Sequence, residues 1–395
     1  MKKKYLATIR SFSGLGNHFH AHDYLWEKLS KSFDKIFVIN DDNLKYFPFL
    51  TQSWIEKKYD FKKIKEFAPK NVELINPSNI KDFDNFVSDK ELLIINQFRR
   101  LFPDLKTHFL VKKHNFKQIQ ITNFGHGTGM SQHVSIKSPL KAIGWYSKIF
   151  SKKLTLILSW LGFINQMEIR FISDKKIIDN INKNKFKKFL YNKKLFFSKE
   201  LVLVNSRNYD ILNDRKEKSS EEYIVHLNAN LNYWQEVELR GKLDEKKITN
   251  HYYYLEKFLN KLSSQYNKKI IICLHPAYDL FETDKYLKNF EVVKYRTREF
   301  IYKAFLVTNF DSSAITDAVL LKKRIIGLIS NHMTKNEVEH SKSQADRCGY
   351  LTVNFQNEYD FDKKKLLKKL DNQIPEYEKK IISNLCIEPD VNGTK

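Results

Sequence analysis

The 395-residue sequence contains few of the residues on which several classes of protein depend. Its three cysteines, Cys273, Cys348 and Cys386, show neither zinc-site spacing nor a disulfide framework, so we expect a protein of a reducing compartment. Eleven glycines and eight prolines exclude a collagen-like or linker-rich chain. No apolar run reaches the roughly 18 residues of a membrane-spanning helix, and the basic start lacks the apolar core of a signal peptide. These absences favour a cytoplasmic globular protein.

Acidic residues are scarce relative to basic ones, since 69 Lys and Arg against 46 Asp and Glu give a formal net charge of +23. A charge of this size suggests an anionic partner, either nucleic acid or a membrane surface. Arginine, which base and phosphate recognition favours, supplies only 11 of the basic residues. The sequence therefore favours an anionic membrane over nucleic acid, and a general compositional bias toward lysine contributes in either case.

Short apolar segments alternate with helical stretches along the chain, which is the pattern of parallel βαβ units. The expected strands are 5–9, 35–39, 91–96 and 118–124 in the first half, and 201–204, 222–226, 269–274, 291–294, 305–308 and 324–329 in the second. Two such series predict two doubly wound α/β domains. We assign residues 1–195 to the first domain, 196–355 to the second, and 356–395 to a C-terminal helical tail.

Two Rossmann-like domains that face a central cleft form the architecture called GT-B, which is common among enzymes that transfer sugars from nucleotides. In such sheets ligands bind at the carboxyl ends of the strands, where loops meet the N-termini of helices. The residues that carry function are therefore expected in those loops.

Two loops of the second domain follow buried strands and carry groups that bind phosphate. One strand delivers His275 to its carboxyl end, and Pro276 fixes the turn that follows. Another is followed by Asp311, Ser312 and Ser313 at the start of an expected helix, whose N-terminus attracts a phosphate. Each loop also has a structural interpretation, either a hydrogen-bonded histidine or N-capping by a side chain. Together the two loops predict a nucleotide site.

A third loop follows the expected strand 118–124 of the first domain. Glycines surround His126 and Thr128, and one of them, Gly127, lies between these two residues. Glycine lets the backbone approach a ligand closely and leaves the imidazole open. A histidine that titrates near neutrality is a suitable general base for an acceptor hydroxyl. The structural alternative is a turn that carries an incidental histidine.

The loop after the first strand contains Gly14 and Gly16, which we include as ligand-facing candidates. The third glycine of a dinucleotide motif is missing, which counts against NAD. His18, His20 and His22 follow, and the first and last of these would share one helix face. No convincing Asp-x-Asp or cysteine partner is visible beside them, which counts against a metal site. An acceptor or phosphate contact and a structural role are the other interpretations of these histidines.

Residues 137–164, within the C-terminal part of the first domain, combine lysines with aromatic residues. The apolar centre, 154–164, is too short to span a bilayer, for which about 20 residues are needed. A basic, aromatic, amphipathic segment suits a helix that lies in the membrane interface. The structural alternative is a buried interdomain helix with a rim of lysines. We expect the protein to be peripheral on the inner membrane.

The motifs between about residues 118 and 330 resemble, in their order, those of bacterial GT-B sialyltransferases and Kdo transferases, which carry an acidic motif, an HP motif and a serine motif. The resemblance implies that His275 contacts the cytidine monophosphate leaving group, and that Ser312 and Ser313 hold its phosphate. Where those families have a catalytic carboxylate, this chain has His126. The His-Gly-Thr loop is similar instead to that of teichoic-acid glycerophosphotransferases, which share the HP strand end and an Asp-Tyr-Ser-Ser stretch. Both groups use cytidine nucleotides.

These resemblances imply an inverting, metal-independent glycosyltransferase that uses no cofactor. It would move a 2-keto sugar acid, of the sialic acid or Kdo type, from a CMP-sugar to a bacterial surface glycan or glycolipid, as in lipooligosaccharide or capsule. His126 would take the acceptor proton, while His275, Ser312 and Ser313 stabilise the departing phosphate. The alternatives are a CDP-polyol phosphotransferase, a non-catalytic GT-B-like binding protein and a nucleic-acid-binding protein.

Overall fold

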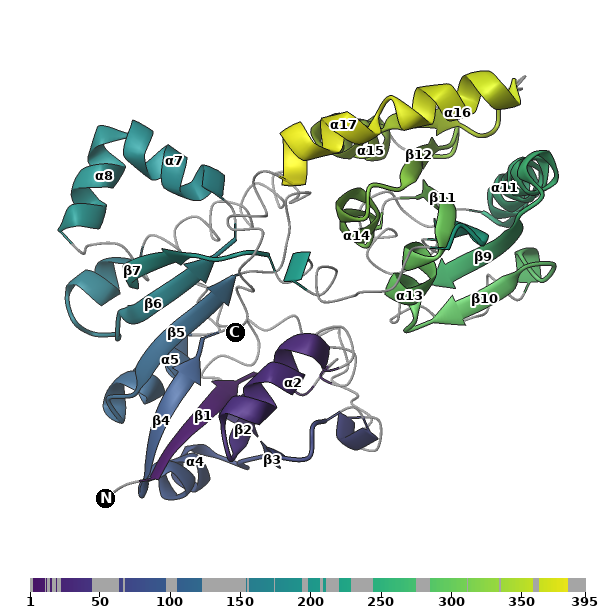
Figure 1. Cartoon of the computed structure of the whole chain (residues 1–395). Coiled ribbons are helices and arrows are strands. Elements are labelled where there is room, and N and C mark those ends of the chain that lie inside the picture. The colour runs from purple at the N-terminus through teal and green to yellow at the C-terminus, as the bar shows by residue number, and fades with distance from the viewer. Residues whose placement is uncertain are drawn as a thin grey trace. The chain divides into compact units, whose positions relative to one another are not determined.

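The fold is described by a computed structural model of the chain. It describes residues 3–10, 12, 15, 19, 23–44, 64–66, 68–96, 105–122, 154, 156–173, 175–193, 198–206, 209–210, 220–228, 244–274, 285–310, 312–333, 335–357 and 362–382. The described residues up to 206 belong to one compact unit and those from 209 onward to a second, each with its own sheet (Figure 1).

The first unit contains a seven-stranded parallel sheet with the order β3-β2-β1-β4-β5-β6-β7. Its strands are β1 (Lys3–Ile9), β2 (Ile36–Ile39), β3 (Val72–Ile75), β4 (Lys90–Ile95), β5 (Lys117–Thr122), β6 (Met167–Ile172) and β7 (Ser198–Leu203). The order reverses between β1 and β4, as it does in Rossmann sheets.

Helices cover both faces of this sheet, because alternate residues of each buried strand point to opposite faces. Ala7 and Phe37 belong to a core shared with α4 and α5, whereas Leu6 and Ile36 belong to a second core with Trp26 of α2. The helices of the unit are α2 (Asp23–Ser32), the 3-10 turn η1 (Asp42–Leu44), α4 (Ile80–Val87), α5 (Leu105–Lys113), α7 (Lys175–Lys183) and α8 (Lys185–Asn192).

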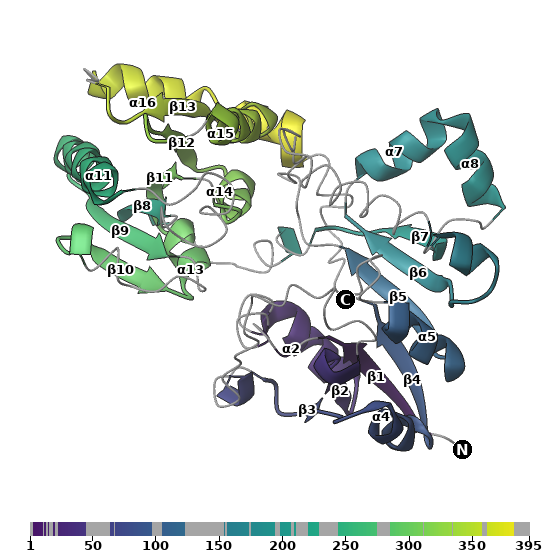
Figure 2. The same ribbon diagram turned by 180° about the vertical axis from the view of Figure 1, so that it is seen from behind.

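The second unit contains a six-stranded parallel sheet with the order β10-β9-β8-β11-β12-β13 (Figure 2). Its strands are β8 (Tyr223–Asn228), β9 (Lys269–Leu274), β10 (Glu291–Lys294), β11 (Ala304–Asn309), β12 (Arg324–Ile329) and β13 (Leu351–Asn354). Numbered within the unit, the order is 3-2-1-4-5-6, again the Rossmann order. The two topologies confirm the predicted α/β class with two Rossmann-like domains, and the cleft between them stays a prediction.

The longest helix of the second unit, α11 (Glu245–Tyr266), begins and ends with clear local signals. The side chain of Asp244 accepts a hydrogen bond from the Lys247 backbone N at 2.8 Å, and Asn267 ends the helix in a left-handed conformation. An apolar stripe that includes Leu255 and Leu259 packs on the sheet. The other helical elements are α13 (Thr297–Tyr302), α14 (Ile315–Leu320), α15 (Lys335–Cys348), α16 (Lys363–Asp371), α17 (Ile374–Tyr377) and the π-helical turn η4 (Glu378–Ile382).

The unit boundaries differ from the predicted domain boundaries at two places. The strand expected at 201–204 is β7, which pairs with β6 and closes the first sheet, so the first unit extends past residue 195. The predicted tail is not separate, because Leu366 and Leu370 of α16 belong to the core under the second sheet. Among the described residues, no helix combines the length and the apolar character needed to cross a bilayer.

The turn from α15 to β13 depends on Gly349, whose φ is +93°. A Cβ atom there would lie 2.8 Å from the Cβ of Glu376. We expect Gly349→Ala to lower the free energy of unfolding by about 1–3 kcal/mol, because it combines backbone strain with crowding. Urea unfolding followed by circular dichroism measures the change. Gly162→Ala is the matched control, since Gly162 also has a positive φ but has no atom within 4 Å of that position; equal midpoints for Gly349→Ala and the wild type would contradict the prediction.

Candidate functional site

The carboxyl ends of β8 and β11 form the topological switch point of the second sheet, where a doubly wound sheet binds its ligand. The turn after β11 contains both predicted serines. Asn309 Oδ1 accepts a hydrogen bond from the Ser312 backbone N at 2.9 Å, and Asn309 Nδ2 donates to Gln344 Oε1 of α15 at 3.0 Å. This buried asparagine therefore fixes the turn at the edge of the sheet.

The two serines differ in their surroundings. Ser312 is half-buried, and its Oγ accepts a hydrogen bond from the Ala314 backbone N at 3.3 Å. Ser313 is exposed at the edge. This hydrogen bond closes a local turn and is not the N-cap that the structural interpretation predicted, because the N-cap of the six-residue helix that follows is Ala314, and no side chain caps it. A hydroxyl that accepts a bond can still donate its proton, so both serines remain suitable donors to a phosphate.

The sequence prediction missed a polar group at the carboxyl ends of the next two strands, which we call the β12–β13 polar cluster. Asn331 N donates to Gln356 Oε1 at 2.5 Å, and Asn354 Nδ2 donates to Asn331 Oδ1 at 2.6 Å. The members of the cluster are Ser330, Asn331, His332, Asn354 and Gln356. The same strand-end rule that singled out Ser312 could have found them, because they follow buried apolar strands.

Helix α11 contributes two more side chains to this cluster. His251 Nδ1 lies 3.3 Å from Ser330 Oγ. The imidazole ring of His251 lies edge-on to the ring of Phe310, with 5.3 Å between the ring centroids. Asn250 Nδ2 lies 3.4 Å from His332 Nε2. These contacts connect the end of β11 to the β12–β13 polar cluster.

The surroundings of His332 make its Nε2 a hydrogen-bond acceptor. The amide nitrogens of Asn250 and Gln356 lie 3.4 and 3.3 Å from its Nε2, and an amide nitrogen can only donate. Burial and then nearby Lys247 lower the pKa of His332, against an opposing effect of Asp244. Because an ordinary histidine titrates near pH 6.5, the His332 ring is neutral at pH 7.

Most of the predicted site residues lie outside the described residues, so their roles stay predictions. They are Gly14, Gly16, His126, Gly127, Thr128, His275 and Pro276. The strands that lead to them are described. β9 ends at Leu274, immediately before His275, and lies beside β8, whose other neighbour is β11. The two predicted donor loops therefore leave the same sheet edge with one strand between them. β5, which leads toward His126, lies in the first sheet between β4 and β6.

The first sheet has a charged residue at its own switch point, which the sequence prediction also missed. Arg10 directly follows β1, is half-buried, and has an Nε that solvent does not reach. Burial lowers the pKa of Arg10 to about 10, against an opposing effect of Asp41, so the guanidinium stays charged at pH 7. Asn96, at the end of β4, is buried at the same edge.

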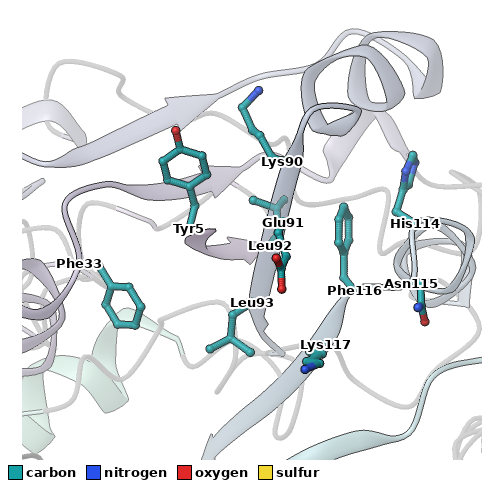
Figure 3. Close-up of a pocket in the computed structure, with 10 residues that line it drawn as sticks. All are labelled: Tyr5, Phe33, Lys90, Glu91, Leu92, Leu93, His114, Asn115, Phe116 and Lys117. Carbon is teal, nitrogen blue, oxygen red and sulfur yellow. The ribbon is translucent and has the colours of Figure 1, made fainter. Parts of the chain in front are cut away.

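A cavity of about 470 Å³ lies elsewhere in the first unit, at the amino ends of β4 and β5 (Figure 3). Two of its polar side chains already have partners. Lys90 Nζ donates to Phe86 O at 2.6 Å, and His114 Nε2 lies 2.7 Å from Asp84 Oδ1. Because ligands of doubly wound sheets bind at the carboxyl edge, this cavity is not the nucleotide site.

Neither a thiol nor a metal site stands out in the described part of the chain. Cys273 and Cys348 are buried, and burial raises the pKa of each thiol to about 12, which leaves no thiolate at neutral pH. Within the same described ranges, no group of three His, Cys, Asp or Glu side chains is placed to hold a metal ion.

No family model matches the sequence, and neither does any curated protein sequence. Solved structures match over nearly the whole chain. The UDP-GlcNAc 2-epimerase from Methanocaldococcus jannaschii is 12% identical over 99% of this chain and 97% of its own, with a TM-score of 0.48. S. aureus MnaA with UDP is 12% identical over 99% and 94%, with a TM-score of 0.47. A variant of the wall teichoic acid polymerase TagF is 11% identical over 97% and 85%, with a TM-score of 0.48. The fold class rests on the strand orders above rather than on these scores.

Proposed function

We propose that the protein is a GT-B transferase that binds a cytidine nucleotide donor on the second unit and passes the activated group to a glycan or glycolipid. One observation carries the proposal: the strand ends that lead into His275 and Ser312 flank β8 at the carboxyl edge of a Rossmann-ordered sheet. The HP and serine motifs are thus attached to the part of the fold where a nucleotide binds.

The proposed donor site has two parts, one that binds the phosphate and one that binds the nucleoside. His275, Ser312 and Ser313 are the hydrogen-bond donors for the phosphate, and such donors stabilise the negative charge that develops on a leaving group. The β12–β13 polar cluster and neutral His332 offer uncharged donors and acceptors, which suit a ribose and a base. Because protein donors meet the phosphate charge, the proposed reaction needs neither a metal nor a cofactor.

In the favoured reaction the donor is a CMP-activated 2-keto sugar acid. The acceptor hydroxyl attacks the anomeric carbon, His126 takes the hydroxyl proton, and the bond to the phosphate oxygen breaks. CMP leaves with the electron pair, and the configuration is inverted. The acceptor belongs to the first unit, where the guanidinium of Arg10 suits a carboxylate or phosphate of a surface glycan.

A second candidate reaction is favoured by the residues around His126. The His126-Gly127-Thr128 loop is similar to that of teichoic-acid glycerophosphotransferases, in which the acceptor attacks a phosphorus atom of a CDP-polyol. CMP is again the leaving group. The two reactions share the donor nucleotide and differ in the group that is transferred, so product analysis separates them.

Nucleotide selectivity tests the proposal directly. We expect CMP and CDP to raise the melting temperature, and UDP and GDP to leave it unchanged at equal concentration. A ligand at 100 times its Kd stabilises the folded state by about 2.7 kcal/mol, which a thermal-shift assay detects readily. Equal shifts with all four nucleotides, or with none, would contradict the proposal. Salt-dependent binding of nucleic acid without nucleotide selectivity would favour the nucleic-acid alternative.

We also propose that the protein is peripheral on an anionic membrane. Residues 137–153 of the expected interface segment lie outside the described residues. In the described part, Leu156 and Leu158 pack against Ile164 and Met167, while Leu161 is 65% exposed. Ile157, Trp160 and Phe163 are exposed as well. An apolar exposed side on a short helical turn supports the membrane interpretation over a buried interdomain helix.

A further inference from the structure

Helix α8 carries two of the most exposed large apolar side chains among the described residues. Phe186 is 67% exposed and Phe189 is 52% exposed, and no residue of the helix is buried. Residues three apart lie on the same side of a helix, so the two rings form one apolar face. The helix is locally well formed, since Asn184 Oδ1 accepts a hydrogen bond from the Lys187 backbone N at 3.0 Å.

The helices α7 and α8 are strongly basic. Residues 175–193 contain seven lysines and one acidic residue, Asp179. The lysines of α8 make no ion pair with any side chain in the described ranges, and none of its charge is neutralised there. Lysine rather than arginine supplies all of this charge, as in the chain as a whole.

The exposed face of α8 does not pack against the sheet of the first unit. The main packing neighbour of α8 among the described elements is α7. Both views show α7 and α8 as an arm beyond β7 of the first unit (Figures 1 and 2). An exposed aromatic pair costs free energy in water unless something covers it.

We infer that α8 is a membrane-docking helix that inserts Phe186 and Phe189 into the interface of an anionic phospholipid bilayer while its lysines contact the headgroups. Charge complementarity points to this occupant, because lysines that make no ion pair within the described ranges, together with aromatic rings on one short helix, match an acidic lipid surface. The inference rests on the proposed peripheral membrane association and deepens it, since it adds a contact outside residues 137–164.

Vesicle co-sedimentation of the full-length protein tests the inference, with phosphatidylglycerol-containing vesicles and pure phosphatidylcholine vesicles at low ionic strength. We expect the wild type to bind only the anionic vesicles. Phe186→Ser/Phe189→Ser should weaken partitioning by about tenfold, because the apolar insertion is lost. Lys187→Gln/Lys188→Gln should weaken it by about tenfold as well, and this loss should disappear at high salt.

Two matched controls make the outcome specific. Lys364 and Lys365 are exposed lysines of α16 in the second unit, so Lys364→Gln/Lys365→Gln removes the same charge elsewhere and should bind vesicles like the wild type. Trp160→Ser/Leu161→Ser tests the other proposed membrane segment. Melting temperature and CMP stabilisation should be unchanged in the α8 variants, which shows that they fold and keep the donor site.

Each outcome is decisive for one proposal. Wild-type partitioning of both α8 variants overturns the inference, and release by Trp160→Ser/Leu161→Ser alone would then leave the membrane association standing. Equal binding of the wild type to neutral and anionic vesicles also overturns the inference, and absence of binding overturns the membrane association with it. CMP stabilisation is measured independently of vesicles, so failure of the donor-site proposal is seen separately.

Discussion

Replacing His126 with alanine is expected to lower kcat by about 10²–10⁴-fold, the range for loss of a positioned general base. The affinity for the donor should stay nearly unchanged, because the proposed base acts on the acceptor hydroxyl, whereas His275, Ser312 and Ser313 are proposed to bind the nucleotide. Histidine must be neutral to accept a proton, and an ordinary histidine titrates near pH 6.5, so the wild-type rate should fall as the pH drops through that range. Initial rates with saturating donor, measured as CMP release from pH 5 to 9, give the loss of kcat and the dependence of the wild-type rate on pH.

The design of that experiment must isolate the chemical step. Single-turnover rates exclude product release as the limiting step, and calorimetry with CMP shows whether the donor site is intact. A variant that keeps more than a tenth of the wild-type single-turnover rate would remove His126 from the mechanism. Asp23 and the histidines at 18, 20 and 22 would then be the next candidates, because they belong to the loop and helix that follow β1.

The second large effect is expected at the donor site. His275→Ala should weaken CMP or CDP binding by about 10–100-fold, because a hydrogen bond to a charged phosphate is worth about 1.5–3 kcal/mol. Isothermal titration calorimetry measures the loss. His114→Gln is a suitable control, since His114 contacts Asp84 at the amino edge of the first sheet and is not part of the proposed donor site. Wild-type CMP affinity in His275→Ala would show that the HP strand end does not bind the donor.

The sequence predicted the strands whose burial is nearly continuous, together with the edge strands β7 and β10, and missed β3, β6 and β13. Runs such as 269–274 and 324–329 are apolar because both faces of a central parallel strand are covered. β3 and β13 lie at sheet edges and are mostly half-buried, so they carry no such run. In β6, Glu168 and Arg170 interrupt the apolar residues. The sheet to which β7 belongs could not be predicted, because a strand pattern does not encode its neighbour.

In the candidate site, the sequence predicted the residues that are consecutive along the chain and missed contacts between residues that are far apart in it. Ser312 and Ser313 were found because strand, turn and helix are consecutive in the sequence. The β12–β13 polar cluster was missed because its partners come from afar: His332 and Asn250 are 82 positions apart, and His251 and Ser330 are 79 apart. Such contacts become visible only when the sheet order brings α11 over the ends of β12 and β13.

The helices that follow β13 also determine when the second unit can finish folding during translation. All seven strands of the first sheet precede residue 204, so that sheet can form while the ribosome is still making the second unit. The second core stays incomplete much longer, because it needs side chains from the helical elements that follow β13. They are Leu366, Leu370, Tyr377, Ile381 and Ile382. The nascent second sheet therefore exposes apolar surface until α16, α17 and η4 have been synthesised.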